Sequence, residues 1–215
     1  MVQSVNLQGI AHTLKLVWHP RAVVPHVIVP DFRYINFKDL YESGFRAVAI
    51  DKDNCLTAPY ETELHPPFRE AWENCKQLFG ENIVVVSNSA GTLDDVGDKQ
   101  AHAIEQSLGV PVLRHKSKKP GCIDELLAHL RSTTPLSDEF NPHRTVVIGD
   151  RILTDVVFGN RLGGFTILTR DLVSEKGDNP VAVKIRRMEH MLVDLLARQG
   201  VKPPKHPLEL KMTDL

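Results

Sequence analysis

The chain has 215 residues, of which 42% are hydrophobic and 25% charged, and this length fits one or two domains with a buried core. Its 26 Lys and Arg against 27 Asp and Glu leave a formal net charge of −1, which argues against a general nucleic-acid-binding protein. The three cysteines are far apart and form no CxxC pair, so they indicate a reducing compartment rather than a disulfide framework or a zinc site.

The first 30 residues contain no acidic side chain, since the first acid is Asp31. The chain has no run of about 18 apolar residues that would predict a transmembrane helix, and its start lacks a signal-peptide core. Apolar residues recur at helical spacing before Pro20: Leu7, Ile10, Ala11, Leu14, Val17 and Trp18. Residues 1–30 are therefore predicted to form an amphipathic segment that either docks on an anionic membrane or packs on the protein's own sheet. The acid-poor start also suits a mitochondrial import signal, although it is poorer in Arg and Ser than such signals usually are.

One compact domain is predicted over residues 31–200, followed by a proline-containing tail over 201–215. Near-continuous apolar runs predict strands buried on both faces at 45–50, 82–87, 145–149 and 165–169, with a weaker run at 111–115. Helices that end at recognisable stop signals are predicted between them at 67–79, 98–108, 123–130 and 152–162. This alternation predicts an α/β fold with a mainly parallel central sheet and helices on both faces.

Polar segments follow the predicted strands: DKDN, SNSAGT, HKSKKPG and GDRILTD. In open α/β sheets, ligands bind at the carboxyl ends of the strands. These segments supply carboxylates, hydroxyl and amide groups and a cluster of lysines. The combination is suited to binding phosphate and magnesium.

Asp51 and Asp53 stand two residues apart at the end of the first predicted strand, where both can face one cavity. Two close carboxylates repel each other, which raises one pKa unless a cation intervenes. With Mg²⁺ present, one can act as a nucleophile and the other as a proton donor and acceptor. An isolated DxD also fits an ordinary loop with helix-capping acids.

Asp150 and Asp155 in the GDRILTD string follow another strand directly. Asp150 fits a magnesium ligand, because Mg²⁺ prefers a few carboxylates together with water and substrate phosphate. Asp155 lies one turn into the next predicted helix, where it can brace the site. Asp150 alone also fits a simple helix N-cap.

Two further segments could bind the phosphate. The hydroxyl, amide and backbone N–H groups of Ser87, Asn88 and the following turn could hold phosphate oxygens. Lys116, Lys118 or Lys119 could neutralise a nucleophile and a developing phosphoryl charge. Each segment taken alone also fits a polar turn or a solvated basic loop, but all four features follow successive strands of one chain.

These motifs together resemble the haloacid dehalogenase (HAD) superfamily of phosphohydrolases. The superfamily features are the DxD at 51–53, the strand-end Ser87, the Lys119-Pro120 pair and the GDxxxxD string at 149–155. More narrowly, VAIDKDNCLTAPY, VVSNSAGT, KKPG and VVIGDRILTDVVFGNRLG resemble the mitochondrial phosphatidylglycerophosphate phosphatase subfamily and its bacterial relatives. The resemblance covers roughly residues 40 to 170.

The resemblance implies a two-step phosphoryl transfer through an aspartyl-phosphate. Asp51 would attack phosphorus, and Asp53 would protonate the leaving alcohol and then activate water. Ser87 would bind the phosphoryl group with Asn88 nearby. Lys119 would hold the charge of the nucleophile and the phosphate, and it is preferred among the three lysines because it directly precedes Pro120.

The resemblance also implies one Mg²⁺ cofactor. Its ligands would be Asp51, the backbone carbonyl of Asp53, and Asp150, with Asp155 in support. The chain departs from the superfamily at Cys55, where Thr or Val is usual, and Cys55 is expected to be a packed side chain without a catalytic role.

The gaps from Asp53 to Ser87 and from Ser89 to Lys119 are too short for the cap domain that many superfamily members carry. A capless, open site suits a substrate too large to be enclosed, such as a membrane lipid head group, a polymer or a protein, unless the neighbours in an oligomer roof the site. For the lipid substrate, peripheral membrane association is expected. The basic side chains Lys184, Arg186 and Arg187 would add head-group attraction, or form a solvated helix face.

The expected activity is hydrolysis of phosphatidylglycerophosphate to phosphatidylglycerol in cardiolipin biosynthesis. The expected location is the matrix side of the mitochondrial inner membrane, or the cytoplasmic face of a bacterial membrane. The alternatives are a phosphatase for a soluble phosphosugar, a nucleic-acid end or a phosphoprotein, and an inactive membrane-binding scaffold.

Overall fold

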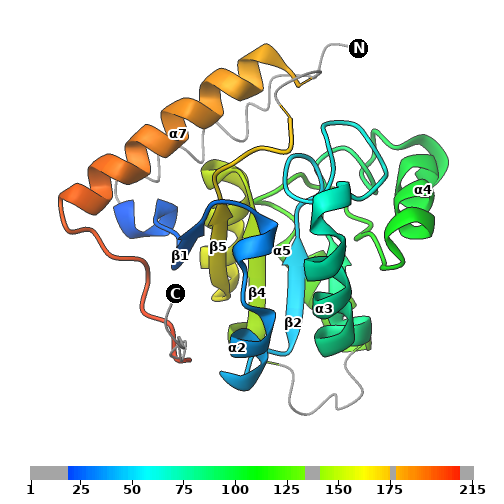
Figure 1. Ribbon diagram of the computed structural model, residues 1–215, viewed down its shortest axis with the longest axis horizontal. Helices are drawn as coiled ribbons and strands as arrows, with labels where there is room; N and C mark the ends of the chain where they lie inside the picture. Colours follow the sequence, from blue (N-terminus) through cyan, green and yellow to red (C-terminus); the bar gives the residue numbers. More distant parts are fainter. Residues whose placement is uncertain (1–18, 134–140, 175–177, 209–215) are drawn as a thin grey trace.

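The computed structural model describes residues 19–133, 141–174 and 178–208, and its centre is a parallel β-sheet (Figure 1). The strands lie in the order β1-β5-β4-β2-β3, and every pairing is parallel. Their bounds are β1 Val27–Val29, β2 Ala47–Ile50, β3 Ile83–Val85, β4 Thr145–Gly149 and β5 Phe165–Thr169. The predicted fold class, an α/β domain with a mainly parallel sheet, is confirmed.

Four of the strands were predicted from their apolar runs, and each is buried along its whole length. The weaker run at 111–115 forms only a single bridge, between Val85 and Val112. β1 was not predicted, because three residues between two prolines carry little periodicity. Its pairing partner β5 defines it as a strand.

The helices cover both faces of the sheet, and alternate residues of β2 point to opposite cores. Val48 and Ile50 pack with α2 (Phe37–Glu42), α3 (Arg69–Phe79) and α4 (Lys99–Leu108). Ala47 and Ala49 pack with α5 (Ile123–Thr133) and α6 (Val157–Leu162). The last helix, α7 (Pro180–Arg198), runs across one end of the molecule (Figure 1).

The helix predicted over 152–162 is divided into a π-helical turn, Ile152–Val156, and α6. The carboxylate of Asp155 lies against the start of this turn, where it accepts a hydrogen bond from the Arg151 backbone N–H at 3.1 Å. Short 3₁₀ turns complete the helical elements: Pro20–Val23, Phe32–Tyr34, Pro66–Phe68, Gly80–Asn82, Val96–Asp98 and Pro142–Arg144.

The segments where a cap could be inserted are fully described and contain no separate domain. Between Asp53 and Ser87 the chain forms loops, α3, β3 and two 3₁₀ turns, and between Ser89 and Lys119 it forms a loop, a 3₁₀ turn, α4 and the bridged segment at 112. Nothing within residues 53–119 therefore covers the strand ends as a domain.

The structure shows residues 27–29 and 201–208 packed with the sheet domain. β1 belongs to the sheet although it lies within the first 30 residues, whereas the apolar stripe from Leu7 to Trp18 lies outside the described residues. Residues 201–208, predicted as a tail, return along the sheet. The His26 ring contacts the Pro204 carbonyl at 3.1 Å, and Leu208 packs against the core.

Candidate active site

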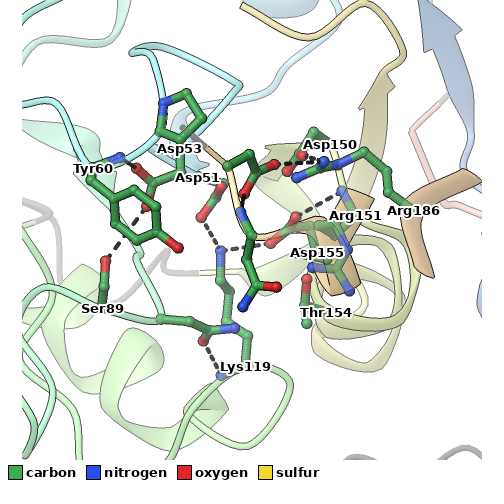
Figure 2. Close-up of a pocket in the computed structure, with 15 residues that line it drawn as sticks. Asp51, Asp53, Tyr60, Ser89, Lys119, Asp150, Arg151, Thr154, Asp155 and Arg186 are labelled. Atoms are coloured by element: carbon green, nitrogen blue, oxygen red, sulfur yellow. Dashed lines mark hydrogen bonds and ion pairs between the residues drawn. The ribbon is translucent and has the colours of Figure 1, made fainter. Parts of the chain in front are cut away.

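A polar cavity of about 140 Å³ lies at the carboxyl ends of β2 and β4, where the sheet meets α7 (Figure 2). Its lining comes from the strand-end segments and from α7: Asp51, Asp53, Pro59, Tyr60, Asn88, Ser89, Lys119, Asp150, Arg151, Thr154, Asp155, Asp178, Asn179, Ala182 and Arg186. Most of the predicted site residues therefore lie together at this edge of the sheet: Asp51, Asp53, Asn88, Lys119, Asp150 and Asp155.

Three carboxylates converge at the base of the cavity. Asp51, Asp150 and Asp155 each offer one oxygen, and these oxygens all lie within 4.8 Å of one another. Asp51 follows β2 and Asp150 follows β4, and these two strands are paired side by side. A cluster of buried carboxylate oxygens is the type of donor set that Mg²⁺ prefers.

Burial of two of these acids disfavours their charged forms. Desolvation and the neighbouring Asp51 raise the pKa of Asp155 to about 6, against the opposing effect of Lys119. Desolvation likewise raises the pKa of Asp150 well above its usual range, although Arg186 partly offsets it. A divalent cation would favour the charged forms of both groups.

Glycine at position 149 is required by this arrangement. A Cβ atom on Gly149 would lie 2.4 Å from Cγ of Asp155 and 2.5 Å from its Oδ2. The close approach lets the Asp155 carboxylate turn back toward the end of β4.

Lys119 connects two of the carboxylates. Its Nζ lies 2.6 Å from Oδ1 of Asp51 and 2.6 Å from Oδ1 of Asp155, and the side chain is buried. Burial alone would lower the pKa of Lys119, but the two carboxylates outweigh it and raise the pKa above its usual range. The lysine therefore stays charged beside Asp51 and Asp155.

The other two lysines lie outside the cavity lining. Lys118 pairs with Asp94 at 2.8 Å, and Lys116 is exposed. The backbone N–H of Lys119 donates to Oδ1 of Asn88 at 2.7 Å, so Asn88 ties the lysine loop to the loop after β3.

Asp53 faces a different set of partners from Asp51. Its Oδ1 accepts from Lys52 Nζ at 2.5 Å and from the Tyr60 backbone N–H at 2.7 Å, and its Oδ2 accepts from the Ser89 hydroxyl at 3.5 Å. Burial raises the pKa of Asp53, with Lys52 acting in the opposite direction. The side chain is therefore outside the carboxylate cluster and is suited to proton transfer.

The structure distinguishes between the serines that follow β3. The Ser87 hydroxyl is buried and accepts hydrogen bonds from the backbone N–H groups of Ser89 and Ala90, at 3.2 and 3.3 Å. Ser89 lines the cavity together with Asn88, whereas Ser87 does not. Ser87, the predicted phosphate ligand, thus shapes the loop, and Ser89 is the serine that reaches the cavity.

The sequence interpretation of Arg186 was wrong. Arg186 was grouped with exposed basic residues of a late helix, but its side chain is buried and its Nε lies 2.6 Å from Oδ2 of Asp150. Its Nη1 donates to Oδ2 of Asp178 at 2.9 Å. Arg186 lies seven residues before the buried Val193 and shares its helix face, but the sequence does not show which face of this helix is buried.

Arg151 and Glu189 also escaped the sequence analysis. Arg151 donates through two nitrogens to the Glu189 carboxylate, at 3.1 Å each, and Glu189 also accepts from the Ile152 backbone N–H at 3.0 Å. These contacts fasten α7 to the segment that carries Asp150 and Asp155.

Comparison with known proteins gives a consistent set of relatives. A family model described as mitochondrial PGP phosphatase matches residues 7–174. Phosphatidylglycerophosphate phosphatase 1, chloroplastic/mitochondrial, of Arabidopsis thaliana is 40% identical over 98% of this chain and 59% of its own length. The chloroplastic phosphatidylglycerophosphate phosphatase 1 of Chlamydomonas reinhardtii is 39% identical over 96% of this chain and 74% of its own length. The mitochondrial phosphatidylglycerophosphatase GEP4 of Saccharomyces cerevisiae is 32% identical over 87% of this chain and 99% of its own length. The chain thus spans about three fifths of the Arabidopsis relative.

Proposed function

Since this chain belongs to the mitochondrial PGP phosphatase family, as its motifs predicted, we propose that it hydrolyses phosphatidylglycerophosphate to phosphatidylglycerol and inorganic phosphate. This reaction provides the phosphatidylglycerol used in cardiolipin biosynthesis. The observation that carries the proposal is the placement of Lys119 between Asp51 and Asp155, with Asp53 beside them in one cavity.

Asp51 is the proposed nucleophile. One of its carboxylate oxygens attacks phosphorus, and the bond from phosphorus to the glycerol oxygen breaks. Lys119, whose Nζ lies 2.6 Å from Oδ1 of Asp51, offsets the negative charge that gathers around the phosphoryl group.

Asp53 is the proposed acid and base. It gives its proton to the departing glycerol oxygen, then takes a proton from the water molecule that attacks the aspartyl-phosphate. That attack releases inorganic phosphate and regenerates the Asp51 carboxylate. The raised pKa of Asp53 suits the first of these roles.

The residues present fit a Mg²⁺ cofactor. Asp51 and Asp150 would hold it together with the backbone carbonyl of Asp53, and Asp155 would support them. When bound, Mg²⁺ supplies positive charge to the phosphate oxygens. Ser89 and Asn88 line the cavity where those oxygens would lie, and Ser87 holds their loop in shape.

The substrate is a membrane lipid, so we place the protein on a membrane surface. The yeast relative GEP4 and the matching family model are named mitochondrial, which supports a mitochondrial location, and within it we propose the matrix side of the inner membrane. Among the described residues, no helix is long and apolar enough to cross a bilayer. We propose peripheral association, because the phosphate that the cavity would bind lies at the bilayer surface.

Phosphate release from phosphatidylglycerophosphate in detergent micelles tests the proposal. We expect activity that requires Mg²⁺, is abolished by EDTA and is lost in Asp51→Asn. A parallel panel of soluble phosphosugars, nucleic-acid ends and phosphopeptides separates the lipid from other substrates. A higher kcat/KM on any soluble ester would assign the site to that substrate class, and turnover that persists in Asp51→Asn would refute the mechanism.

A further inference from the structure

α7 has an exposed apolar face that the catalytic proposal does not use. Six of its apolar side chains are between 38 and 64% exposed: Val181, Ile185, Met188, Met191, Leu192 and Leu195. Their spacing of mostly three and four residues places them along one side of the helix. Apolar side chains gathered in this way mark an interaction surface rather than the scattered exposure that is normal for proteins.

The opposite face of α7 is fixed to the active site. Val193 packs with Ile152 and Val156 in a buried cluster. Glu189 binds Arg151, and Arg186 binds Asp150. The exposed face therefore has a fixed orientation with respect to the cavity, which Asn179, Ala182 and Arg186 help to line.

Exposed apolar side chains also flank the cavity on the side away from α7. Tyr60 lines the cavity and is 57% exposed. Leu93 and Val96, 76 and 79% exposed, lie on the loop between β3 and α4, which starts at the same carboxyl edge of the sheet. Figure 1 shows this loop and α7 at the same end of the molecule. Tyr60 at the cavity, together with Leu93 and Val96 on this loop, therefore forms a second apolar margin at the end of the molecule where α7 lies.

The charges beside the exposed face of α7 are basic, whereas those of the other margin are mixed. Lys184 lies within the exposed face of α7, and none of the residues of that face is acidic. Beside the other margin, Lys99 and Lys116 are exposed, and so is Asp94, which lies between Leu93 and Val96 and pairs with Lys118 at 2.8 Å. An apolar face with a basic fringe matches the interface of an anionic bilayer, where apolar side chains enter the acyl region and Lys and Arg meet the head groups.

We propose that the exposed face of α7, together with Tyr60, Leu93 and Val96, is a docking surface for an anionic lipid bilayer. This proposal rests on the proposed lipid phosphatase function. Docking at both margins brings the cavity onto the head groups, so the substrate reaches Asp51 without leaving the bilayer. Burial of each Leu- or Met-sized side chain strengthens binding by on the order of tenfold.

Vesicle cosedimentation with the full chain tests the docking surface. Phosphatidylcholine vesicles are compared with and without phosphatidylglycerol, using Met188→Glu/Leu195→Glu and, for the other margin, Leu93→Ser/Val96→Ser. Asn74→Glu/Gln77→Glu on α3 is the matched control, because it adds the same charge at exposed positions outside the docking surface. Melting temperatures establish that each variant is folded.

We expect the wild type and the α3 control to bind the anionic vesicles, and each margin variant to bind at least tenfold more weakly. On phosphatidylglycerophosphate in vesicles, kcat/KM should fall in parallel with binding. On a dispersed short-chain form of the same lipid, the variants should keep the wild-type rate. Docking without hydrolysis of either form would remove the proposed function and leave the docking surface standing.

Either of two binding results would overturn the inference outright: wild-type affinity in Met188→Glu/Leu195→Glu, or a wild type that does not bind vesicles. A further variant, Leu7→Glu/Leu14→Glu, tests the first 18 residues. Loss of binding in this variant alone would also overturn the inference, because it would assign docking to those residues instead.

Discussion

The close approach between Gly149 and Asp155 leads to the sharpest prediction. Gly149→Ala would place a Cβ atom 2.4 Å from Cγ of Asp155, whereas carbon atoms pack at about 3.5 Å or more. The carboxylate must therefore move by roughly 1 Å. Overpacking of this kind costs about 1–3 kcal/mol of unfolding free energy.

The same movement disturbs catalysis through Lys119. The carboxylate of Asp155 lies 2.6 Å from Lys119 Nζ and 3.1 Å from the Arg151 N–H, and neither contact survives a shift of that size. Lys119 would lose one of its two ion pairs and would no longer be held in place beside Asp51. Misplacement of a catalytic group by about 1 Å costs on the order of 10²-fold in rate, so we expect a similar fall in kcat.

Gly159→Ala provides a control with the same steric defect away from the cavity. A Cβ there would lie 2.4 Å from Cγ2 of Thr166 and 2.8 Å from Cβ of Val147, and none of these residues lines the cavity. Denaturant unfolding measures the stability of both variants, and kcat is measured below the unfolding range. If Gly149→Ala kept kcat within threefold of Gly159→Ala at equal stability, the link from Asp155 to Lys119 would be wrong.

Three further outcomes follow from the charged groups. Lys119→Met should lower kcat by about 10²–10³-fold, because it removes the cation that pairs with Asp51, whereas the exposed Lys38→Met on α2 should keep the wild-type rate in the same assay. Mg²⁺ at about 100 times its Kd should stabilise the wild type by about 2.7 kcal/mol in calorimetry, and a similar gain in Asp150→Asn would rule out that carboxylate as a ligand. Burial and the nearby His206 lower the pKa of His26 to about 4. The contribution of neutral His26 to the free energy of unfolding is therefore complete above about pH 6.5 and is lost as the pH falls toward 4. Denaturant unfolding at pH 7 and pH 4.5 measures this loss of unfolding free energy. After allowance for the partial exposure of His26, the loss should be about 1–2 kcal/mol smaller in His26→Gln than in the wild type, and an equal loss in the two proteins would contradict the reasoning.

The strand ends were predictable because they depend on local sequence and one topological rule. Asp51 and Asp150 each follow a continuous apolar run, and parallel strands bring their carboxyl ends to one edge of the sheet. Lys119 could be chosen from three lysines only through the family resemblance. Its burial between Asp51 and Asp155 is a tertiary contact that no local pattern encodes.

The contributions of α7 could not be predicted for the same reason. Arg186 lies 36 residues after Asp150, and a basic residue on an amphipathic helix is ordinarily solvated. Only the packing of Val193 against Ile152 and Val156 turns the Arg186 side of the helix inward. The distinction between Ser87 and Ser89 likewise depends on which hydroxyl the loop's own N–H groups bind, and a motif does not show that.

The balance of charge in the cavity supports the magnesium proposal. Asp53 pairs with Lys52, and among the other described groups in or against the cavity there are five acids and three bases: Asp51, Asp150, Asp155, Asp178 and Glu189, with Lys119, Arg151 and Arg186. Fully ionised, this set carries two negative charges in excess, in a place where burial already raises the pKa of Asp150 and Asp155. One divalent cation supplies the missing charge, whereas a monovalent ion supplies half of it. Arg186 already neutralises one oxygen of Asp150, so the cation and the arginine must share that carboxylate, and α7 is thereby coupled to metal binding.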